Sequence, residues 1–451
     1  MSYIKKYFKK EVLIIGYGLT GKSVSKFLQK QKCKIYVWDD GFDKSHIQSN
    51  EKIKIYNIEN KNIDNFNYIF VSPGIQKEHF LVLKAKEKNI TIMSDIELYW
   101  EVKQLENIKN NLIAVTGTNG KSTIALMIAH IIKTKPLGNY GNPILKALGE
   151  KKPQQVIELS SFQLDNIINF KSKISIISNI NRDHISHHKT FKQYLEAKMK
   201  IIKNQTKEDY LLVNYDDKNI KKYIESRENI NPIIIYVSNK VILKKGISVT
   251  KNKLIDNFFS NKEYLIKDTS FFNLNHNKIN LAFSFAALTL LGKEPKHILN
   301  KLSSFKGLAH RLEYLGVINN IKFFNDSKAT NVSATCSALE SFEKVILIAG
   351  GSSKGDSFQP LKKYSKVIYQ AYLFGDTALE ISDSLEPNCP SYICNDLDEA
   401  VKKSYKASLL DGKFYPILFS PACASFDQYQ NFEKRGEHFN SIFNKLLKEA
   451  A

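Results

Sequence analysis

The sequence predicts an α/β protein of three domains, each built around a mainly parallel sheet. Apolar runs of about four to eight residues alternate with amphipathic helical stretches, the pattern of buried strands joined by crossover helices. Strand–glycine–helix starts near residues 11, 112 and 345 could each open a separate sheet. A chain of 451 residues is also too long for one ordinary core.

Two candidate boundaries divide the chain into predicted domains at residues 1–97, 98–306 and 307–451. The first boundary is placed within "SDIELYW", and the second within "LSSFKGL", whose small residues suit a linker. Residues 204–275 contain isolated β-type residues among many Asn and Lys, so we expect a small antiparallel extension of the middle domain.

The composition argues against a nucleic-acid-binding protein despite a net charge of +21. Only four of the 66 basic residues are arginine, the residue that makes most bidentate contacts to bases and phosphates. The lysines are spread along the chain, so they favour small anionic substrates instead of a nucleic acid. The five scattered cysteines indicate neither a disulfide framework nor a zinc site.

No apolar run is long enough to cross a bilayer, and "LAFSFAALTLL" at 281–291 is better explained as a buried helix. The start "MSYIKKYFKKEVLIIGYG" resembles a signal peptide only faintly, because its apolar run is short and glycines follow at once. We therefore expect a cytoplasmic protein without membrane insertion.

The first strand leads into "GYGLTG", in which Gly16, Gly18 and Gly21 have the spacing of a dinucleotide-binding turn. Asp39 and Asp40 close the next strand, where a carboxylate commonly binds a ribose. The first domain is therefore predicted to be Rossmann-like. A nicotinamide cofactor or any other nucleotide diphosphate would satisfy the motif, and so would glycines that serve only close helix–strand packing.

A second glycine turn, "GTNGKST", connects a strand to an apolar helix at the start of the middle domain. Its backbone N–H groups can surround phosphate oxygens, Lys121 can reach the terminal phosphates, and Ser122 offers a hydroxyl for Mg²⁺. Val115 stands where an ordinary phosphate loop has its first glycine. The alternative is a glycine turn with an exposed lysine, but the strand and helix on either side favour a P-loop-type ATPase domain.

Two strand ends in the middle domain carry candidate metal ligands. Glu158 ends "VIE" and could bind Mg²⁺ opposite the loop hydroxyl, although such carboxylates often only cap helices. Asp183 and His184 follow "ISIISNIN". We expect a single metal-binding or acid–base histidine there and no zinc site, because no second ligand cluster has suitable spacing.

The third domain is also predicted to be Rossmann-like, and its loops bring cations close to glycines and hydroxyl groups. Arg311, Asp326, Lys328 and Lys354 lie in "HRLEY", "NDSKATN" and "AGGSSKGDSF", which suit anion capture. The last strand leads into "FSPACASFDQYQNFEKRG". Cys423 in that turn has no obvious base close to it in sequence, so a nucleophilic thiol is not expected.

In their order along residues 11–439, these motifs resemble the Mur ligase family of ATP-dependent amide-bond ligases of peptidoglycan synthesis. The supporting segments include "GYGLTG", "SPGI", "GTNGKST", "ELSSFQL", "NHNKIN", "HRLE", "NDSKATN" and "SPACASFDQ". Within the family, "SFQL" and "SPACASFDQ" favour the member that adds D-glutamate to UDP-N-acetylmuramoyl-L-alanine. The resemblance implies ATP and Mg²⁺ as cofactors, an acyl-phosphate intermediate, and a monomer that closes its domains around the substrates.

The resemblance also implies roles for individual residues. The UDP-sugar site would comprise Leu19, Thr20, Asp39, Asp40, Gly74 and Asn139, with Ser160 as a further substrate contact. The ATP site would comprise Gly117, Thr118, Asn119, Gly120, Lys121, Ser122, Thr123, Asn277, Asn280, Arg311 and Asp326. The metal ligands would be Ser122, Glu158, His184 and Lys198. The catalytic residues would be Lys121, His184, Lys198 and Lys328. The D-glutamate pocket would comprise Lys328, Thr330, Lys354, Ser425, Phe426 and Phe432.

Lys198 is the residue whose role depends most on the resemblance. From the residues alone, a lysine of "FKQYLEAKMKIIKN" belongs to a solvated helix face. The resemblance implies that Lys198 is converted to a carbamate, which replaces a cation with an anionic oxygen ligand for Mg²⁺. Asn275 and Ser352 depart from the family pattern, and the connection from His184 to Lys198 is slightly short.

Three other functions remain open from the sequence. A sister ligase for L-alanine, a diamino acid or folate-linked glutamate would share the ATP core. A dehydrogenase would use "GYGLTG" and leave the phosphate loop idle. A non-catalytic nucleotide-binding protein would bind ATP without forming an amide.

Overall fold

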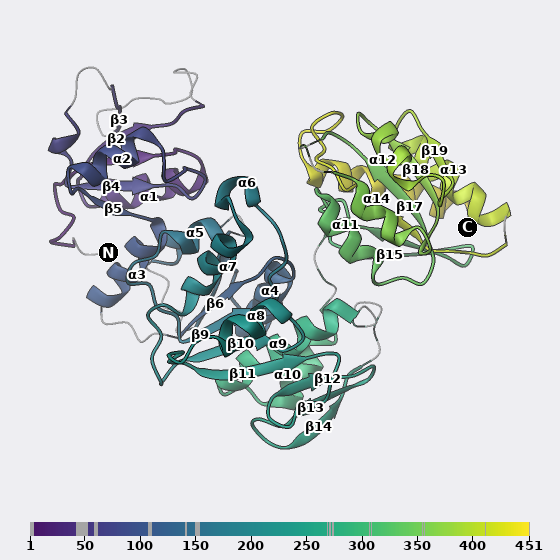
Figure 1. Cartoon of the computed structure of the whole chain (residues 1–451), viewed down its shortest axis with the longest axis horizontal. Helices are drawn as coiled ribbons and strands as arrows, with labels where there is room; N and C mark the ends of the chain where they lie inside the picture. Colours follow the sequence, from purple (N-terminus) through teal and green to yellow (C-terminus); the bar gives the residue numbers. More distant parts are fainter. Residues whose placement is uncertain are drawn as a thin grey trace. The chain divides into compact units, whose positions relative to one another are not determined.

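The computed structural model describes the chain in two compact units (Figure 1). The first comprises residues 1–266 and 278–302, and the second residues 267–277 and 303–451. The residues described are 4–41, 53–57, 62–106, 111–139, 142–148, 154–267, 269, 272, 275–305, 307, 309–353, 355, 357–410 and 412–450. Three sheets, two in the first unit and one in the second, confirm the predicted α/β class.

The N-terminal sheet is parallel throughout, with the strand order β3-β2-β1-β4-β5 (purple to blue in Figure 1). This is the strand order of the predicted Rossmann-like domain, and its switch point lies between β1 and β4. The elements are β1 (Glu11–Ile15), α1 (Leu19–Lys30), β2 (Lys34–Trp38), β3 (Ile53–Ile55), β4 (Tyr68–Val71), α2 (Phe80–Glu87) and β5 (Thr91–Met93).

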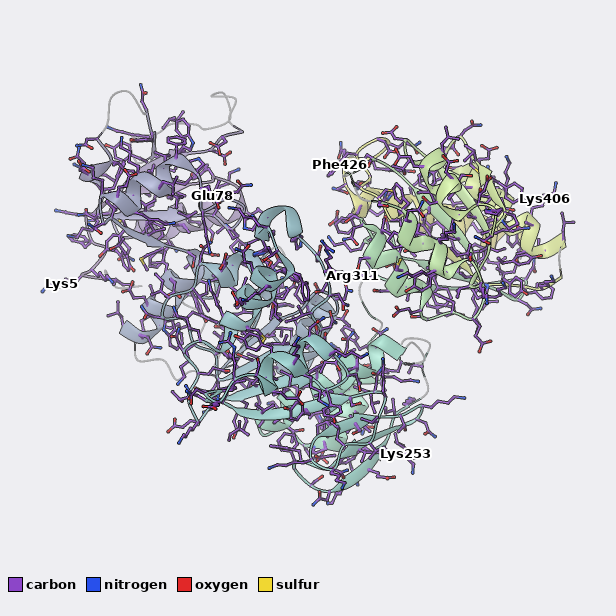
Figure 2. The ribbon with its side chains drawn as sticks, viewed as in Figure 1. Lys5, Glu78, Lys253, Arg311, Lys406 and Phe426 are labelled. Atoms are coloured by element: carbon purple, nitrogen blue, oxygen red, sulfur yellow. The ribbon has the colours of Figure 1, made fainter. Side chains whose placement is uncertain are left out.

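The central sheet has nine strands in the order β14-β13-β12-β11-β10-β9-β6-β8-β7. Its strands are β6 (Leu112–Thr116), β7 (Leu137–Gly138), β8 (Gln155–Glu158), β9 (Ile174–Ile177), β10 (Tyr210–Asn214), β11 (Ile233–Ser238), β12 (Ile247–Val249), β13 (Lys253–Asp256) and β14 (Lys262–Leu265). The antiparallel pairs β12–β13 and β13–β14 form an extension within the predicted range, and Figure 2 shows Lys253 on it. The range 204–275 is too wide, because β10 and β11 also lie in it and pair in parallel as part of the main sheet.

The central helices surround this sheet. They are α4 (Lys121–Ile132), α5 (Ser161–Asp165), α6 (Ile185–His188), α7 (Phe191–Met199), α8 (Lys218–Glu225), α9 (Asn275–Leu290) and α10 (Pro295–Leu302). Leu281, Phe283, Phe285 and Leu288 of α9 are at most 1% exposed, so the apolar run at 281–291 is a buried helix as predicted. No helix of the described residues is long and apolar enough to cross a membrane.

Helix α3 (Asp95–Leu105) contains the position expected to separate the first two domains. Ser94 caps this helix by accepting a hydrogen bond from the Glu97 N–H, so "SDIE" begins a helix. The Glu97 carboxylate accepts backbone N–H groups of Ile168, Asn169 and Phe170 in the central region. A buried carboxylate with three such partners fixes α3 against the central region.

The second unit has one sheet in the order β15-β16-β20-β17-β18-β19 (green to yellow in Figure 1). Strand β15 is an antiparallel edge, and the others are parallel. The elements are β15 (Glu313–Ile318), β16 (Ile321–Asn325), α11 (Val332–Leu339), β17 (Val345–Gly350), β18 (Ile368–Phe374), α12 (Ala378–Leu385), β19 (Ser391–Ile393), α13 (Leu397–Leu410), β20 (Ile417–Phe419) and α14 (Phe432–Glu449). The loops that follow the neighbouring parallel strands β16, β20 and β17 therefore lie at one edge of the sheet, where α/β folds bind ligands.

Candidate active site

The glycine turn between β6 and α4 has the backbone shape that a phosphate loop needs. Gly117 has φ +152°, and a Cβ there would lie 2.0 Å from the Ser178 Oγ. Gly120 has φ +82°, and its Cβ would lie 2.7 Å from the Asn280 Oδ1. Neither position accommodates a side chain without displacement, so both glycines are required for this loop shape and its close contacts.

Side chains from later in the chain hold this loop in place. The Thr118 Oγ1 lies 2.9 Å from the Tyr194 hydroxyl, and the Asn119 N–H donates to the Asn179 Oδ1 at 2.8 Å. The Ser178 hydroxyl donates to the Asn119 carbonyl at 2.6 Å. Sequence reasoning missed these three partners; Ser178 and Asn179 lie inside the predicted run "ISIISNIN" and directly follow the observed strand β9.

Two lysine amines converge on one backbone carbonyl of the loop. The Lys121 Nζ donates to the carbonyls of Gly117 and Thr118 at 2.9 and 2.8 Å, and the Lys198 Nζ donates to the Gly117 carbonyl at 2.9 Å. Lys198 is only 2% exposed, so its interpretation as part of a solvated face is wrong. Burial, and then the charge of Lys121, hold the pKa of Lys198 well below its usual range. A lysine in this environment can present the neutral amine that reacts with CO₂.

Glu158 is the last residue of β8, and only one oxygen of its buried carboxylate has a hydrogen-bond partner among the described residues. Its Oε1 accepts the Asn139 side-chain N–H at 2.8 Å, while the buried Oε2 has no hydrogen-bond partner among the described residues. An orphaned carboxylate oxygen in a buried position fits a metal ligand. Ser122 lies in the first turn of α4 and is 2% exposed. The charge of Glu158 acts on Lys198 by raising its pKa, against the larger effects of burial and Lys121.

His184 directly precedes α6 in a left-handed conformation, with φ +51°. Burial lowers its pKa, Asp183 raises it, and the charges of Lys198 and Lys121 lower it further. A neutral imidazole at this position can accept a proton or bind a metal. The described residues contain no group of three or more His, Cys, Asp or Glu side chains placed to bind a metal. The expected Mg²⁺ set therefore depends on the Ser122 hydroxyl and a modified Lys198 as well as on Glu158 and His184.

Two other predicted residues of this unit have clear contacts. Asn280 lies beside Gly120, so α9 brings an amide to the phosphate loop, and Asn277 lies one turn earlier on the same helix. Ser160 caps α5, where its hydroxyl accepts the Gln163 N–H in a capping box. Its hydroxyl therefore also has a local structural role.

The N-terminal glycine turn is held by a carboxylate from the next strand. Gly16 has φ +85°, and the Asp39 Oδ2 accepts the Tyr17 N–H at 2.6 Å. The Asp40 carboxylate accepts the Trp38 indole N–H at 2.9 Å, a bond that lowers the pKa of Asp40. Leu19 is 69% exposed, and it starts α1 directly before Thr20.

Across the switch point of this sheet, a second loop meets the glycine turn. The Ser72 hydroxyl donates to the Gly16 carbonyl at 2.7 Å, so the loop after β4, which carries Gly74, lies next to the loop after β1. A Cβ at Gly74 would meet no atom within 4 Å. The structure therefore places Leu19, Thr20, Asp39, Asp40 and Gly74 at the edge where Rossmann folds bind nucleotide diphosphates, whereas Asn139 follows β7 of the central sheet.

In the second unit, Asp326 follows β16 and is almost fully buried. Its Oδ1 accepts the Leu312 N–H at 3.0 Å, and its Oδ2 accepts the Ser420 hydroxyl at 2.7 Å. Burial raises the pKa of Asp326 to about 7 even though these bonds and Arg311 act in the opposite direction. Arg311 lies in the turn before β15 and is labelled in Figure 2.

The residues expected to bind D-glutamate gather around the loops after β16 and β20. The Lys328 ammonium lies 3.8 Å from the centre of the Phe432 ring, and the Ser327 hydroxyl donates to the Phe432 carbonyl. Phe426 is 72% exposed on its loop (Figure 2). Ser425 is buried beside it and Thr330 is partly buried, whereas Lys354 lies outside the described residues.

Cys423 lies in the same loop but does not have the environment of a nucleophile. It is 3% exposed, lies 3.1 Å from the Thr377 hydroxyl, and burial raises the pKa of its thiol to about 11. Nucleophilic cysteines need a lowered pKa. All five cysteines are free.

A parallel three-sheet fold with a phosphate loop, an orphaned carboxylate and a buried lysine defines a class of ATP-using enzyme, and the comparisons agree. The Mur ligase middle domain matches residues 115–288, and the MurD-like N-terminal domain of Mur ligases matches residues 10–94. The chain belongs to the Mur ligase family.

Two curated relatives, both named UDP-N-acetylmuramoylalanine–D-glutamate ligase, align over almost the whole chain. The protein from Rickettsia bellii is 36% identical over 97% of this chain and 98% of its own length. The protein from Clostridioides difficile is 33% identical over 97% of this chain and 99% of its own length.

Solved structures of lower sequence identity share the fold. The MurF ligase of Thermotoga maritima in complex with ADP has a TM-score of 0.61 at 14% identity, covering 99% of this chain and 100% of that one. The UDP-N-acetylmuramate–alanine ligase of the same organism has a TM-score of 0.55 at 18% identity, covering 97% and 99%.

Proposed function

We propose that this chain joins D-glutamate to UDP-N-acetylmuramoyl-L-alanine, with ATP converted to ADP and phosphate, as a step of peptidoglycan synthesis. The fold and the phosphate loop define an ATP-dependent ligase, and near-full-length similarity to the two named ligases supports the choice of substrates. The observation that carries the proposal is the convergence of Lys121 and Lys198 on the Gly117 carbonyl, with Glu158 influencing the buried lysine.

The reaction has two chemical steps. The L-alanine carboxylate attacks the γ-phosphorus of ATP, giving an acyl phosphate and ADP, and the D-glutamate amine then attacks the acyl carbon and displaces phosphate. In the first step, the Lys121 ammonium would turn from the loop carbonyls to the β- and γ-phosphates and neutralise developing charge. The loop N–H groups would hold phosphate oxygens at the start of α4.

Mg²⁺ fits the donor set of Ser122, Glu158, His184 and a carbamate on Lys198. Its chemistry would be to neutralise phosphate charge and polarise the transferred phosphoryl group. The buried, unpartnered Glu158 oxygen supports this set, as does the lowered pKa of Lys198. The carbamate would arise when the neutral Lys198 amine attacks CO₂ and loses a proton.

The amino-acid substrate has two carboxylates, and Lys328 and Lys354 would bind them in the second unit. Thr330, Ser425, Phe426 and Phe432 would line the rest of this pocket. Arg311 and Asp326 would contact the nucleotide of ATP. The UDP-sugar would be contacted by Leu19, Thr20, Asp39, Asp40, Gly74 and Asn139. We further infer a cytoplasmic protein, because its proposed substrates are soluble nucleotides and amino acids, and a monomer, because a monomer suits closure of the domains around those substrates.

The experiment that tests the function supplies the protein with Mg²⁺-ATP, UDP-N-acetylmuramoyl-L-alanine and one amino acid at a time. We expect phosphate release with D-glutamate and an amide product of matching mass. Release with L-alanine, a diamino acid or another substrate would identify a sister ligase. No release with any amino acid would contradict the ligase function.

A further inference from the structure

Arg435, near the start of α14, is completely buried and has no role in the chemistry described so far. Its exposed fraction is 0%, which is unusual for the side chain that carries the most strongly basic group in proteins. The "NFEKRG" segment places it close in sequence to Phe432, but sequence alone indicated no function for it.

The guanidinium group uses all five of its N–H donors on three loops. The Nε donates to the Ser327 hydroxyl at 3.2 Å, and one Nη donates to the carbonyls of Ser327 and Cys423 at 2.9 and 3.0 Å. The other Nη donates to the carbonyls of Ala424 and Gly350 at 2.9 and 3.5 Å. These acceptors lie at the carboxyl ends of β16, β20 and β17, so one planar group fixes the spacing of three neighbouring loops.

The positive charge of Arg435 has no direct acidic partner. No carboxylate of the described residues lies within ion-pair distance of its guanidinium, and Asp427 acts on it only from further away. Burial lowers the pKa of Arg435 to about 10, which still leaves it charged at neutral pH. A buried charge without a counter-ion is costly, so its retention at this edge suits a site that receives an anion.

The three loops that Arg435 holds are those expected to bind the amino acid. Lys328 directly follows Ser327, and Ser425 directly follows Ala424. The hydroxyl of Ser327, which accepts from Arg435, donates in turn to the Phe432 carbonyl, and the Phe432 ring lies under the Lys328 ammonium. A chain of direct contacts therefore connects the guanidinium to the proposed carboxylate-binding lysine.

We propose that Arg435 is a positioning residue for the amino-acid pocket: it sets the spacing of the three loops and adds positive potential for the substrate carboxylates. It acts through Ser327 and the loop carbonyls and does not itself touch the substrate. This inference rests on the proposed function, because the pocket is the one assigned to D-glutamate.

The test compares Arg435→Lys with Lys434→Gln, a matched control that removes a charge from an exposed neighbour on the same helix. Lysine keeps the charge of Arg435 but cannot donate to three separated loops. We expect R435K to raise the KM for D-glutamate by about tenfold or more, with the KM values for ATP and the UDP-sugar changed less than about twofold. K434Q should leave all three unchanged. A D-glutamate KM unchanged in R435K, or a parallel rise of all three, would overturn the inference.

A second variant covers the case in which R435K does not fold. Ser327→Ala removes the acceptor of the Arg435 Nε and the link to Phe432 while leaving the arginine in place. We expect a selective rise of the D-glutamate KM by about threefold to tenfold. An unchanged KM in S327A would then refute the positioning role.

The wild-type protein separates this inference from the proposed function. If another amino acid triggers phosphate release, the assignment of D-glutamate is wrong, and the same comparison is made with the KM of that amino acid. If none of the amino acids tested triggers phosphate release, both proposals are overturned.

Discussion

Replacing Gly120 with alanine tests whether the phosphate loop and α9 act together on the nucleotide. The residue has φ +82°, a conformation that costs an alanine about 1–2 kcal/mol. The new Cβ would lie 2.7 Å from the Asn280 Oδ1, so the amide must move away by roughly 0.5 Å or more. The end of a side chain moves easily, so this displacement adds little to the loss of stability. It removes the proposed nucleotide contact, which corresponds to a rise of about tenfold in the KM for ATP.

Gly292→Ala is the matched control because it shares the backbone strain but not the contact. Gly292 has φ +77°, and its Cβ would meet no atom within 4 Å. Both variants should lose about 1–2 kcal/mol of unfolding free energy, which lowers the Tm by several degrees. Only Gly120→Ala should bind ATP more weakly.

The assay has two parts, both made on the same preparations. Thermal unfolding without nucleotide measures the strain, and phosphate release against ATP concentration measures the KM. An unchanged KM in Gly120→Ala would refute the role of Asn280. An equal rise in Gly292→Ala would show that strain in the unit, and not the local contact, controls ATP binding.

Three further predictions concern charged groups of the first unit. Lys121→Ala should lower ADP formation at least about 100-fold, because the charge stabilising phosphoryl transfer is lost; full ADP formation would exclude the proposed role. Lys198→Ala should lose activity similarly, and bicarbonate should restore the rate of wild-type protein depleted of CO₂; full activity without CO₂ would rule out a required carbamate. Burial raises the pKa of Asp95 from 3.8 to about 6, so the folded state binds this proton more tightly than the unfolded state. The contribution of Asp95 to the unfolding free energy should therefore fall by about 3 kcal/mol between pH 4 and 6 and then level off. Asp95→Asn should remove this fall in urea titrations, and parallel pH profiles for both proteins would contradict the assignment.

Sequence reasoning located the parts of the site that depend on local geometry. A strand, a glycine turn and a helix follow one another in the chain, so both the N-terminal turn and the phosphate loop could be predicted from spacing. The α/β class and the buried α9 also followed from apolar patterning. The change in composition after residue 204 indicated an antiparallel extension, but not that it begins only at β12, after the parallel strands β10 and β11.

The features that sequence reasoning missed depend on contacts between distant segments. Tyr194 reaches Thr118 across 76 positions, and Arg435 reaches Ser327 across 108. Lys198 is buried and donates to the Gly117 carbonyl, 81 positions away, which its helix alone could not indicate. The bonds of Glu97, beside the predicted boundary, were also missed because its partners at 168–170 lie far along the chain.

The network that holds the phosphate loop has a consequence for protein engineering. Its supports come from Ser178, Asn179, Tyr194 and Lys198, all outside the seven-residue segment "GTNGKST" that carries the glycine motif. Grafting that segment alone onto another α/β scaffold would transfer the sequence of the motif without the contacts that make the loop rigid. Nucleotide binding would then have to order the loop, at about 1–2 kcal/mol of backbone entropy per residue. A transplantable ATP site from this chain would therefore have to include β9 and α7 together with the loop.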